Sequence, residues 1–97
     1  MASRPSISTD QRRAPRIEIA LGGAVVAGPR RFPAMFVNIS AHGAMAEIGQ
    51  RLLPGRPVLV ELGDLAPLRA RVVWAHDGHL GLAFDAELSV EALLGLC

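Results

Sequence analysis

Three arginines, Arg12, Arg13 and Arg16, fall within five positions near the N-terminus, and Pro15 directly precedes the last of them. A guanidinium group is planar and always charged, and its fork of N–H donors fits a phosphate or the O6/N7 edge of guanine. Proline fixes its own φ and favours an extended backbone at the preceding residue. Residues 11–16 therefore predict a semi-rigid arm that binds an anionic, guanine-bearing ligand.

A second polar group, formed by Asn38, Ser40 and Gly43, interrupts the apolar pattern further along the chain. Asn and Ser side chains bond to the local backbone in turns, and glycine permits a positive φ. The Asn carbonyl and the Ser hydroxyl can also accept hydrogen bonds from the N1–H and amino groups of guanine. The residues alone leave both interpretations open, a simple turn or part of a binding site.

Short stretches of alternating apolar residues, separated by turn signals, must position these groups. Gly28-Pro29 and Leu53-Pro54-Gly55 are typical of turns, and Asp77-Gly78 is a strong signal for a two-residue hairpin. Regularly spaced short strands favour a small antiparallel barrel or sandwich. The strands expected are 17–21 continuing through a Gly-Gly pair into 24–27, then 30–37, 44–48, 58–62, 68–74 and 80–84.

In the last residues of the chain the spacing of apolar residues changes from the alternation of a strand to that of a helix. Val90, Leu93, Leu94 and Cys97 follow the spacing of one helical face, which predicts a short C-terminal α-helix with Asp85 as its N-cap. In a regular strand Trp74 shares one face with Leu68, Ala70 and Val72, and it is therefore expected in the core. The fold predicted is mainly all-β, a six-stranded antiparallel β-barrel with a short C-terminal helix over one mouth.

The 97 residues suffice for one domain, which we expect at 11–97 behind a flexible tail at 1–10. The chain has no long apolar run and no secretory signal pattern, so a cytoplasmic protein without membrane insertion is expected. A net charge of +1 and 4% aromatic residues disfavour nucleic-acid binding. His76 and His79 have no third ligand at metal spacing, which predicts no metal site. Ser40 has no evident catalytic partners, so an enzyme is not expected.

The two polar groups together match a known pattern. Arg12-x-x-x-Arg16 followed by Asn38-x-Ser40-x-x-Gly43 resembles the RxxxR and [D/N]xSxxG motifs of the PilZ domain family. Residues 80–84 also resemble the LG-x-x-F stretch of that family, and the resemblance covers roughly residues 11–97. It implies a split-barrel fold that binds the bacterial second messenger cyclic di-GMP, with no further cofactor.

The resemblance also implies a role for each motif residue. Arg12 and Arg16 would contact phosphate and the Hoogsteen edge of guanine, and Arg13 would contact phosphate or stack on a base. Asn38 and Ser40 would hydrogen-bond a guanine. The ligand-binding set carried over is Arg12, Arg13, Arg16, Asn38, Ser40 and Gly43, in which Gly43 holds the turn and leaves room for the ligand.

The function implied is that of a receptor. Cyclic di-GMP would order the arm against the barrel, and the protein, a monomer or weak dimer, would signal to an unidentified protein partner in motility, exopolysaccharide or biofilm control. The alternative is an interaction adaptor that has the same fold but little or no affinity for nucleotides.

Overall fold

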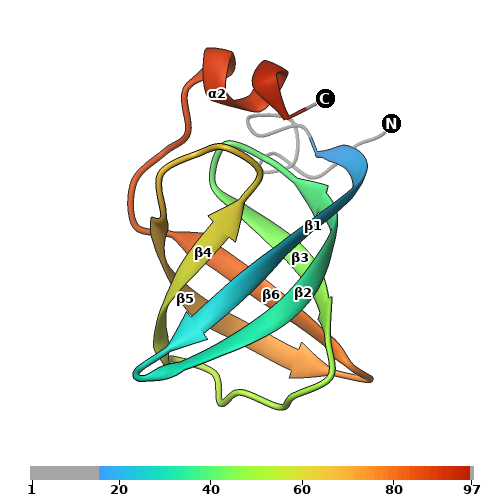
Figure 1. Cartoon of the computed structure of the whole chain (residues 1–97), viewed down its shortest axis with the longest axis vertical. Coiled ribbons are helices and arrows are strands. Elements are labelled where there is room, and N and C mark those ends of the chain that lie inside the picture. The colour runs from blue at the N-terminus through green and yellow to red at the C-terminus, as the bar shows by residue number, and fades with distance from the viewer. Residues whose placement is uncertain (1–15, 97) are drawn as a thin grey trace, which may run out of the picture.

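The structure is a computed structural model that describes residues 16–96. Within this range six antiparallel strands close into a barrel in the order β1-β2-β3-β6-β5-β4 (Figure 1). The predicted all-β fold is confirmed. The elements are β1 (Ile17–Ala27), β2 (Arg30–Ile39), β3 (Gly43–Ile48), β4 (Pro57–Leu62), β5 (Leu68–His76), β6 (His79–Phe84) and the short helix α2 (Val90–Gly95).

Alternate strand residues point into the barrel and fill it. The largest fully buried side chains are Phe36, Ile39, Leu62 and Leu80, each at most 1% exposed. Burying a side chain of this kind contributes about 1.5–3 kcal/mol, so this interior is the main source of stability. β1 and β4 approach closely at Gly23, where a Cβ would lie 2.0 Å from the carbonyl oxygen of Glu61. Gly23 thus allows β1 to continue as one strand past its neighbour, whereas a Cβ on Gly22 would meet nothing within 4 Å.

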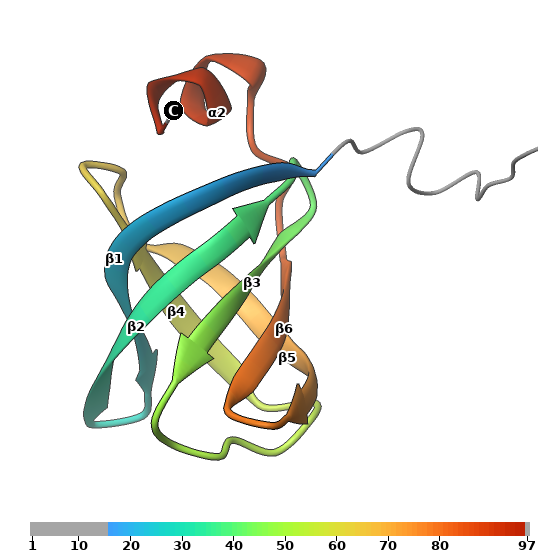
Figure 2. The same ribbon diagram turned by 90° about the vertical axis from the view of Figure 1, so that its right-hand side faces the viewer.

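The two ends of the barrel differ in what they carry (Figures 1 and 2). At the arm end, as we call it, lie the start of β1, the turn 40–42 between β2 and β3, and α2. At the opposite hairpin end lie the connection 49–56 and the β5–β6 turn. Asp77 and Gly78 in that turn have φ values of 52° and 78°. Two consecutive positive φ values are those of a type I′ turn, as Asp-Gly predicts.

The helix α2 begins later than the sequence suggested. Its N-cap is Ser89, whose Oγ accepts a hydrogen bond of 3.0 Å from the amide of Ala92. The prediction of Asp85 is wrong because its amide donates to the carbonyl of Arg69 at 2.9 Å, which holds Asp85 beside β5. Residues 85–88 then cross to the helix, and Leu88 is buried in the core on the way. No helix among the described residues is long and apolar enough to cross a membrane.

Candidate ligand-binding site

Arg16 and Asn38, one residue from each predicted motif, are in direct contact. The start of β1 pairs with the end of β2, with Glu18 opposite Asn38. This register places Arg16 beside Asn38, and Arg16 Nη1 donates a hydrogen bond of 3.0 Å to Asn38 Oδ1. The structure therefore brings together two groups that are 22 residues apart. Arg12 and Arg13 lie outside the described residues, so their part in the site stays a prediction.

Ser40 is buried, at 5% exposed, and its hydroxyl is engaged within the turn. Its Oγ accepts from the amide of His42 at 3.2 Å and lies 3.5 Å from the carbonyl oxygen of Gly43. The Ser40 amide donates to the same carbonyl at 2.8 Å. These bonds fix the shape of the turn that follows Asn38. A direct bond between Ser40 and a ligand stays a prediction, whereas its role in holding the turn is visible in the structure.

Gly43 is the first residue of β3 and pairs with Ala83 of β6. Its φ is not positive, so the conformational freedom expected from the sequence is not used here. The structure needs glycine for a different reason, since a Cβ at this position would lie 2.1 Å from the carbonyl oxygen of Leu82. The oxygen belongs to the backbone of Leu82, and the Cβ would be bonded directly to the backbone of residue 43. Rotation of a side chain therefore could not relieve the contact. Glycine allows β3 to pair with β6 directly beside the turn.

Trp74 lies on the outer surface, and the prediction that it is buried is wrong. A bulge between Val72 and Trp74 shifts the register of β5, so that Val72 is 1% exposed whereas Trp74 is 40% exposed. Trp74 pairs with Gly81, and its indole covers the space that a side chain there would fill, 2.2 Å from a Cβ built on Gly81. The indole therefore lies flat against β6 with one face open to solvent.

Asn38 and Trp74 belong to one row of paired residues on the outside of the barrel. Asn38 pairs with Met45, Met45 with Gly81, and Gly81 with Trp74. We call Asn38, Met45, Gly81 and Trp74 the outer row. Neighbouring strands lie about 4.8 Å apart, so the row is roughly 14 Å long over the sheet surface. It offers a hydrogen-bonding group beside Arg16 at one end and an aromatic face at the other.

A basic side chain borders the Trp74 end of the outer row. Arg71 on β5 is exposed, pairs with Ala83 in the neighbouring row, and donates through Nη1 to the carbonyl of Gly55 at 2.9 Å. Arg69 is also exposed but lies further from Trp74 along the same strand, where it pairs with Leu59. With Arg16 at the other end, the row has one cation near each end. This arrangement suits a ligand that combines flat bases with phosphates.

The family model for the PilZ domain matches residues 10–96. The chain belongs to the PilZ domain family. One solved structure with a similar fold is the PilZ domain of CeSA from a cellulose-synthesizing bacterium, at 20% sequence identity and a TM-score of 0.62 over 75% of this chain and 82% of that chain. Comparison with curated proteins finds no match.

Membership gives the general kind of function. PilZ domains form a family of receptors for cyclic di-GMP, and they are binding domains rather than enzymes. In this PilZ domain Arg16, the second arginine of RxxxR, contacts Asn38, the first residue of the NxSxxG motif, and Ser40 and Gly43 shape the turn.

Strand alternation alone predicts Trp74 in the core. The hairpin signal at Asp77-Gly78 would have corrected this, because counting back from that turn sets Trp74 opposite the outward-facing Gly81.

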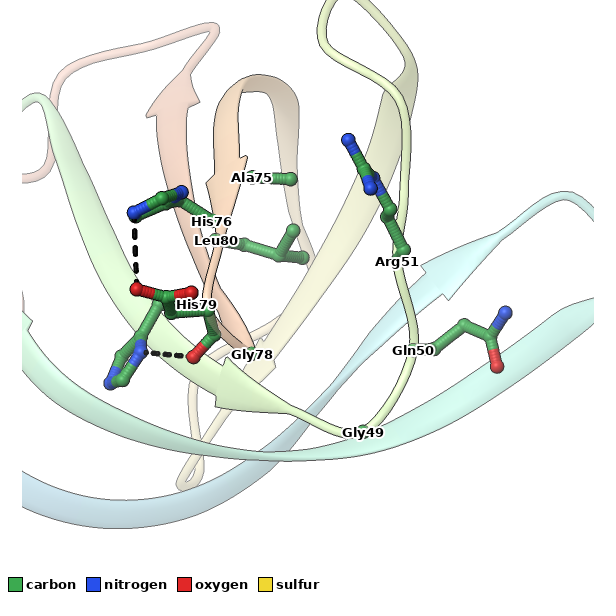
Figure 3. A pocket seen from close by; sticks show the side chains of 9 residues that line it. Gly49, Gln50, Arg51, Ala75, His76, Gly78, His79 and Leu80 are labelled. Atoms are coloured by element: carbon green, nitrogen blue, oxygen red, sulfur yellow. Dashed lines mark hydrogen bonds and ion pairs between the residues drawn. The ribbon is translucent and has the colours of Figure 1, made fainter.

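A separate pocket of about 370 Å³ lies at the hairpin end, between residues 49–51 and the β5–β6 hairpin (Figure 3). Two of its lining residues, His76 and Asp77, contact each other, with His76 Nε2 3.1 Å from Asp77 Oδ2. A third, His79, lies with its Nε2 3.4 Å from Oε2 of Glu47, which is outside the pocket lining. Among the described residues no group of three or more His, Cys, Asp or Glu side chains is arranged to hold a metal ion. The pocket is thus distinct from the outer row and contains neither motif.

Proposed function

We propose that this PilZ domain is a cyclic di-GMP receptor whose ligand lies on the outer row and is enclosed by the arm of Arg12, Arg13 and Arg16. The observation that carries the proposal is the Arg16–Asn38 hydrogen bond. It places a bidentate phosphate- or guanine-binding group directly beside an amide that can bond the guanine edge. The ligand would replace or share this bond.

Trp74 extends the proposed site. One face of its indole is open, and base–aromatic stacking contributes about 1–3 kcal/mol per base. A guanine stacked on Trp74 and another bonded near Asn38 would be separated by roughly three strand spacings, about 14 Å. A mutually stacked pair of ligand molecules spans such a row better than one molecule does. We therefore expect two cyclic di-GMP molecules per domain.

The consequence proposed for the cell is signalling to a protein partner in motility, exopolysaccharide or biofilm control. Ordering of the arm on ligand binding would be a disorder-to-order switch, in which phosphate and guanine contacts offset the cost of ordering. The expected cytoplasmic location and the monomeric or weakly dimeric state stay predictions of the sequence. The proposed partner is a protein that binds the domain only when cyclic di-GMP is bound.

Calorimetric titration with cyclic di-GMP tests the receptor assignment, with GTP and cyclic di-AMP as control ligands. We expect saturable binding with a Kd at or below ~10 μM, about −7 kcal/mol, and a stoichiometry near two. Arg16→Ala should abolish binding, and Arg16→Lys should restore little of it because an ammonium lacks the planar fork.

The matched control is Arg51→Ala, which removes an exposed arginine from the hairpin-end pocket and should leave binding unchanged. Normal binding by Arg16→Ala would show that the arm is wrongly assigned. Absence of binding by the wild-type protein would favour the adaptor function instead.

A further inference from the structure

The turn that follows Asn38 is hydrogen-bonded to the segment that leads into α2. The carbonyl of Ala41 accepts from the amide of Leu88 at 2.8 Å, and the carbonyl of His42 accepts from the amide of Phe84 at 2.7 Å. Both carbonyls at the tip of the turn are thus used to hold residues 84–88. A displacement of the turn would stretch these bonds or carry the segment with it.

Side chains reinforce the same connection. His42 Nε2 lies 3.6 Å from Glu87 Oε2, a contact that becomes an ion pair when the imidazole is protonated. Both groups are more than half exposed, so solvent screens the pair and the backbone bonds dominate. The turn itself is stiff, because Ser40 is bonded to both His42 and Gly43. A change at Asn38 therefore reaches residues 84–88 through a short, bonded path.

Leu88 joins this path to α2. Its side chain is buried at 9% exposed, and the next residue, Ser89, is the N-cap of the helix. The helix has only six residues, and none of them is fully buried. Isolated helices of this length are not stable in water, so α2 depends on tertiary contacts. These are the Leu88 anchor and the partly buried side chains of Ala92, Leu93 and Leu96, which pack against the core. Figure 2 shows α2 above β1 at the arm end, away from the hairpin end.

We propose that the turn 40–43 and α2 form one coupled unit, so that a ligand held on the outer row restrains residues 84–88 and the helix that follows them. The inference rests on the proposed function, since it needs a ligand at Asn38. It adds that α2 is the element whose structure responds when ligand occupies the outer row. Coupling between two sites is reciprocal, so loosening α2 must weaken ligand binding by the same factor.

Amide hydrogen exchange, followed by NMR on the full chain with and without cyclic di-GMP, tests the forward direction. We expect exchange at the amides of Leu88 and Phe84 to slow by about fivefold or more, the lower end of usual coupling factors. The control amide is that of Ile48, which bonds to the carbonyl of Gly78 at the hairpin end. Slowing at Ile48 would report only the general stabilisation that any ligand gives, so the effect at Leu88 must exceed it.

Ser89→Ala tests the reverse direction. It removes the cap bond to Ala92 without touching the outer row, and we expect a severalfold higher Kd for cyclic di-GMP. The matched control is Val90→Ala, which shortens an exposed side chain of the same helix and keeps the cap. Its Kd should equal that of the wild type.

The receptor assignment and the coupling between the turn and α2 can be refuted separately. If calorimetry detects cyclic di-GMP binding but the amides of Leu88 and Phe84 respond no more than that of Ile48, the coupling is refuted and the receptor assignment stands. An unchanged Kd in Ser89→Ala, with α2 shown to be loosened by faster exchange at Ala92, refutes it equally. If cyclic di-GMP does not bind, the proposed function and the coupling fall together.

Discussion

Replacing Gly43 with alanine should strongly destabilise the domain even in the absence of ligand. The added Cβ would lie 2.1 Å from the carbonyl oxygen of Leu82 and 3.2 Å from its carbonyl carbon. A relaxed carbon–oxygen contact needs about 3.3 Å, so β3 and β6 would have to separate locally by roughly 1 Å. Such a shift disrupts the neighbouring ladder bonds, each of which contributes about 0.5–1.5 kcal/mol net, in addition to the usual overpacking cost of ~1–3 kcal/mol.

We therefore expect Gly43→Ala to lose about 3 kcal/mol of unfolding free energy. For a domain of this size each kcal/mol lowers Tm by about 4–8 °C, so Tm should fall by roughly 12–24 °C. Thermal unfolding followed by far-UV circular dichroism measures this. The matched control is Gly22→Ala, because a Cβ on Gly22 meets nothing within 4 Å. If the two variants unfold within ~1 kcal/mol of each other, the close approach of β3 and β6 is not what requires glycine at position 43.

Further predictions concern the outer row, the turn and the hairpin. Trp74→Ala should weaken cyclic di-GMP binding by about 1–3 kcal/mol, and quenching of the single tryptophan on ligand addition would report the same contact in the wild type. Gly81→Ala should displace the indole, because the new Cβ would lie 2.2 Å from Trp74 Nε1, and the emission of Trp74 should shift to longer wavelength; unchanged emission would contradict the packing described. Ser40→Ala leaves the His42 amide without its partner and should cost about 1–3 kcal/mol in urea unfolding; an effect on ligand affinity with no loss of stability would assign Ser40 to the ligand instead. Asp77→Ala should cost about 1–2 kcal/mol because Asp77 has a φ of 52°, whereas Asp77→Asn should be nearly neutral; equal stabilities would argue against the type I′ turn.

The strands were predictable because one face of each is buried. The alternation in residues 80–84 matches the burial of Leu80 and Leu82 and the outward position of Gly81. The alternation in β5 held only as far as Val72, since a bulge after it inverts the faces that follow. Bulges leave little trace in a single strand. Here the register of the hairpin carried the missing information, because the Asp-Gly turn fixes which residues of β5 and β6 are opposite each other.

The sequence names the residues of the candidate site, and their role in ligand binding stays a prediction. The motifs indicated that Arg16 and Asn38 belong together, and in the structure Arg16 Nη1 lies 3.0 Å from Asn38 Oδ1. Local sequence preferences could not show that Gly43 is needed because β3 and β6 approach closely at this position. The contact is with Leu82 of β6, which is far along the chain. The helix start was missed for a similar reason. Asp85 is a good N-cap by type, but its backbone is bonded to β5, and tertiary contacts override such preferences.

Closure of the barrel limits how another protein can recognise this domain. Within residues 16–96 β4 pairs with β1 and completes the circle, so each strand has a partner on both sides along part of its length. An extended peptide that binds by strand addition needs a sheet edge with unpaired backbone groups. Such an edge is confined here to stretches where one strand extends beyond its neighbour, as residues 17–22 of β1 extend beyond the pairing with β4 at 23–26. Elsewhere on the barrel, recognition by another protein depends on side chains and connecting segments, which can change without altering the barrel.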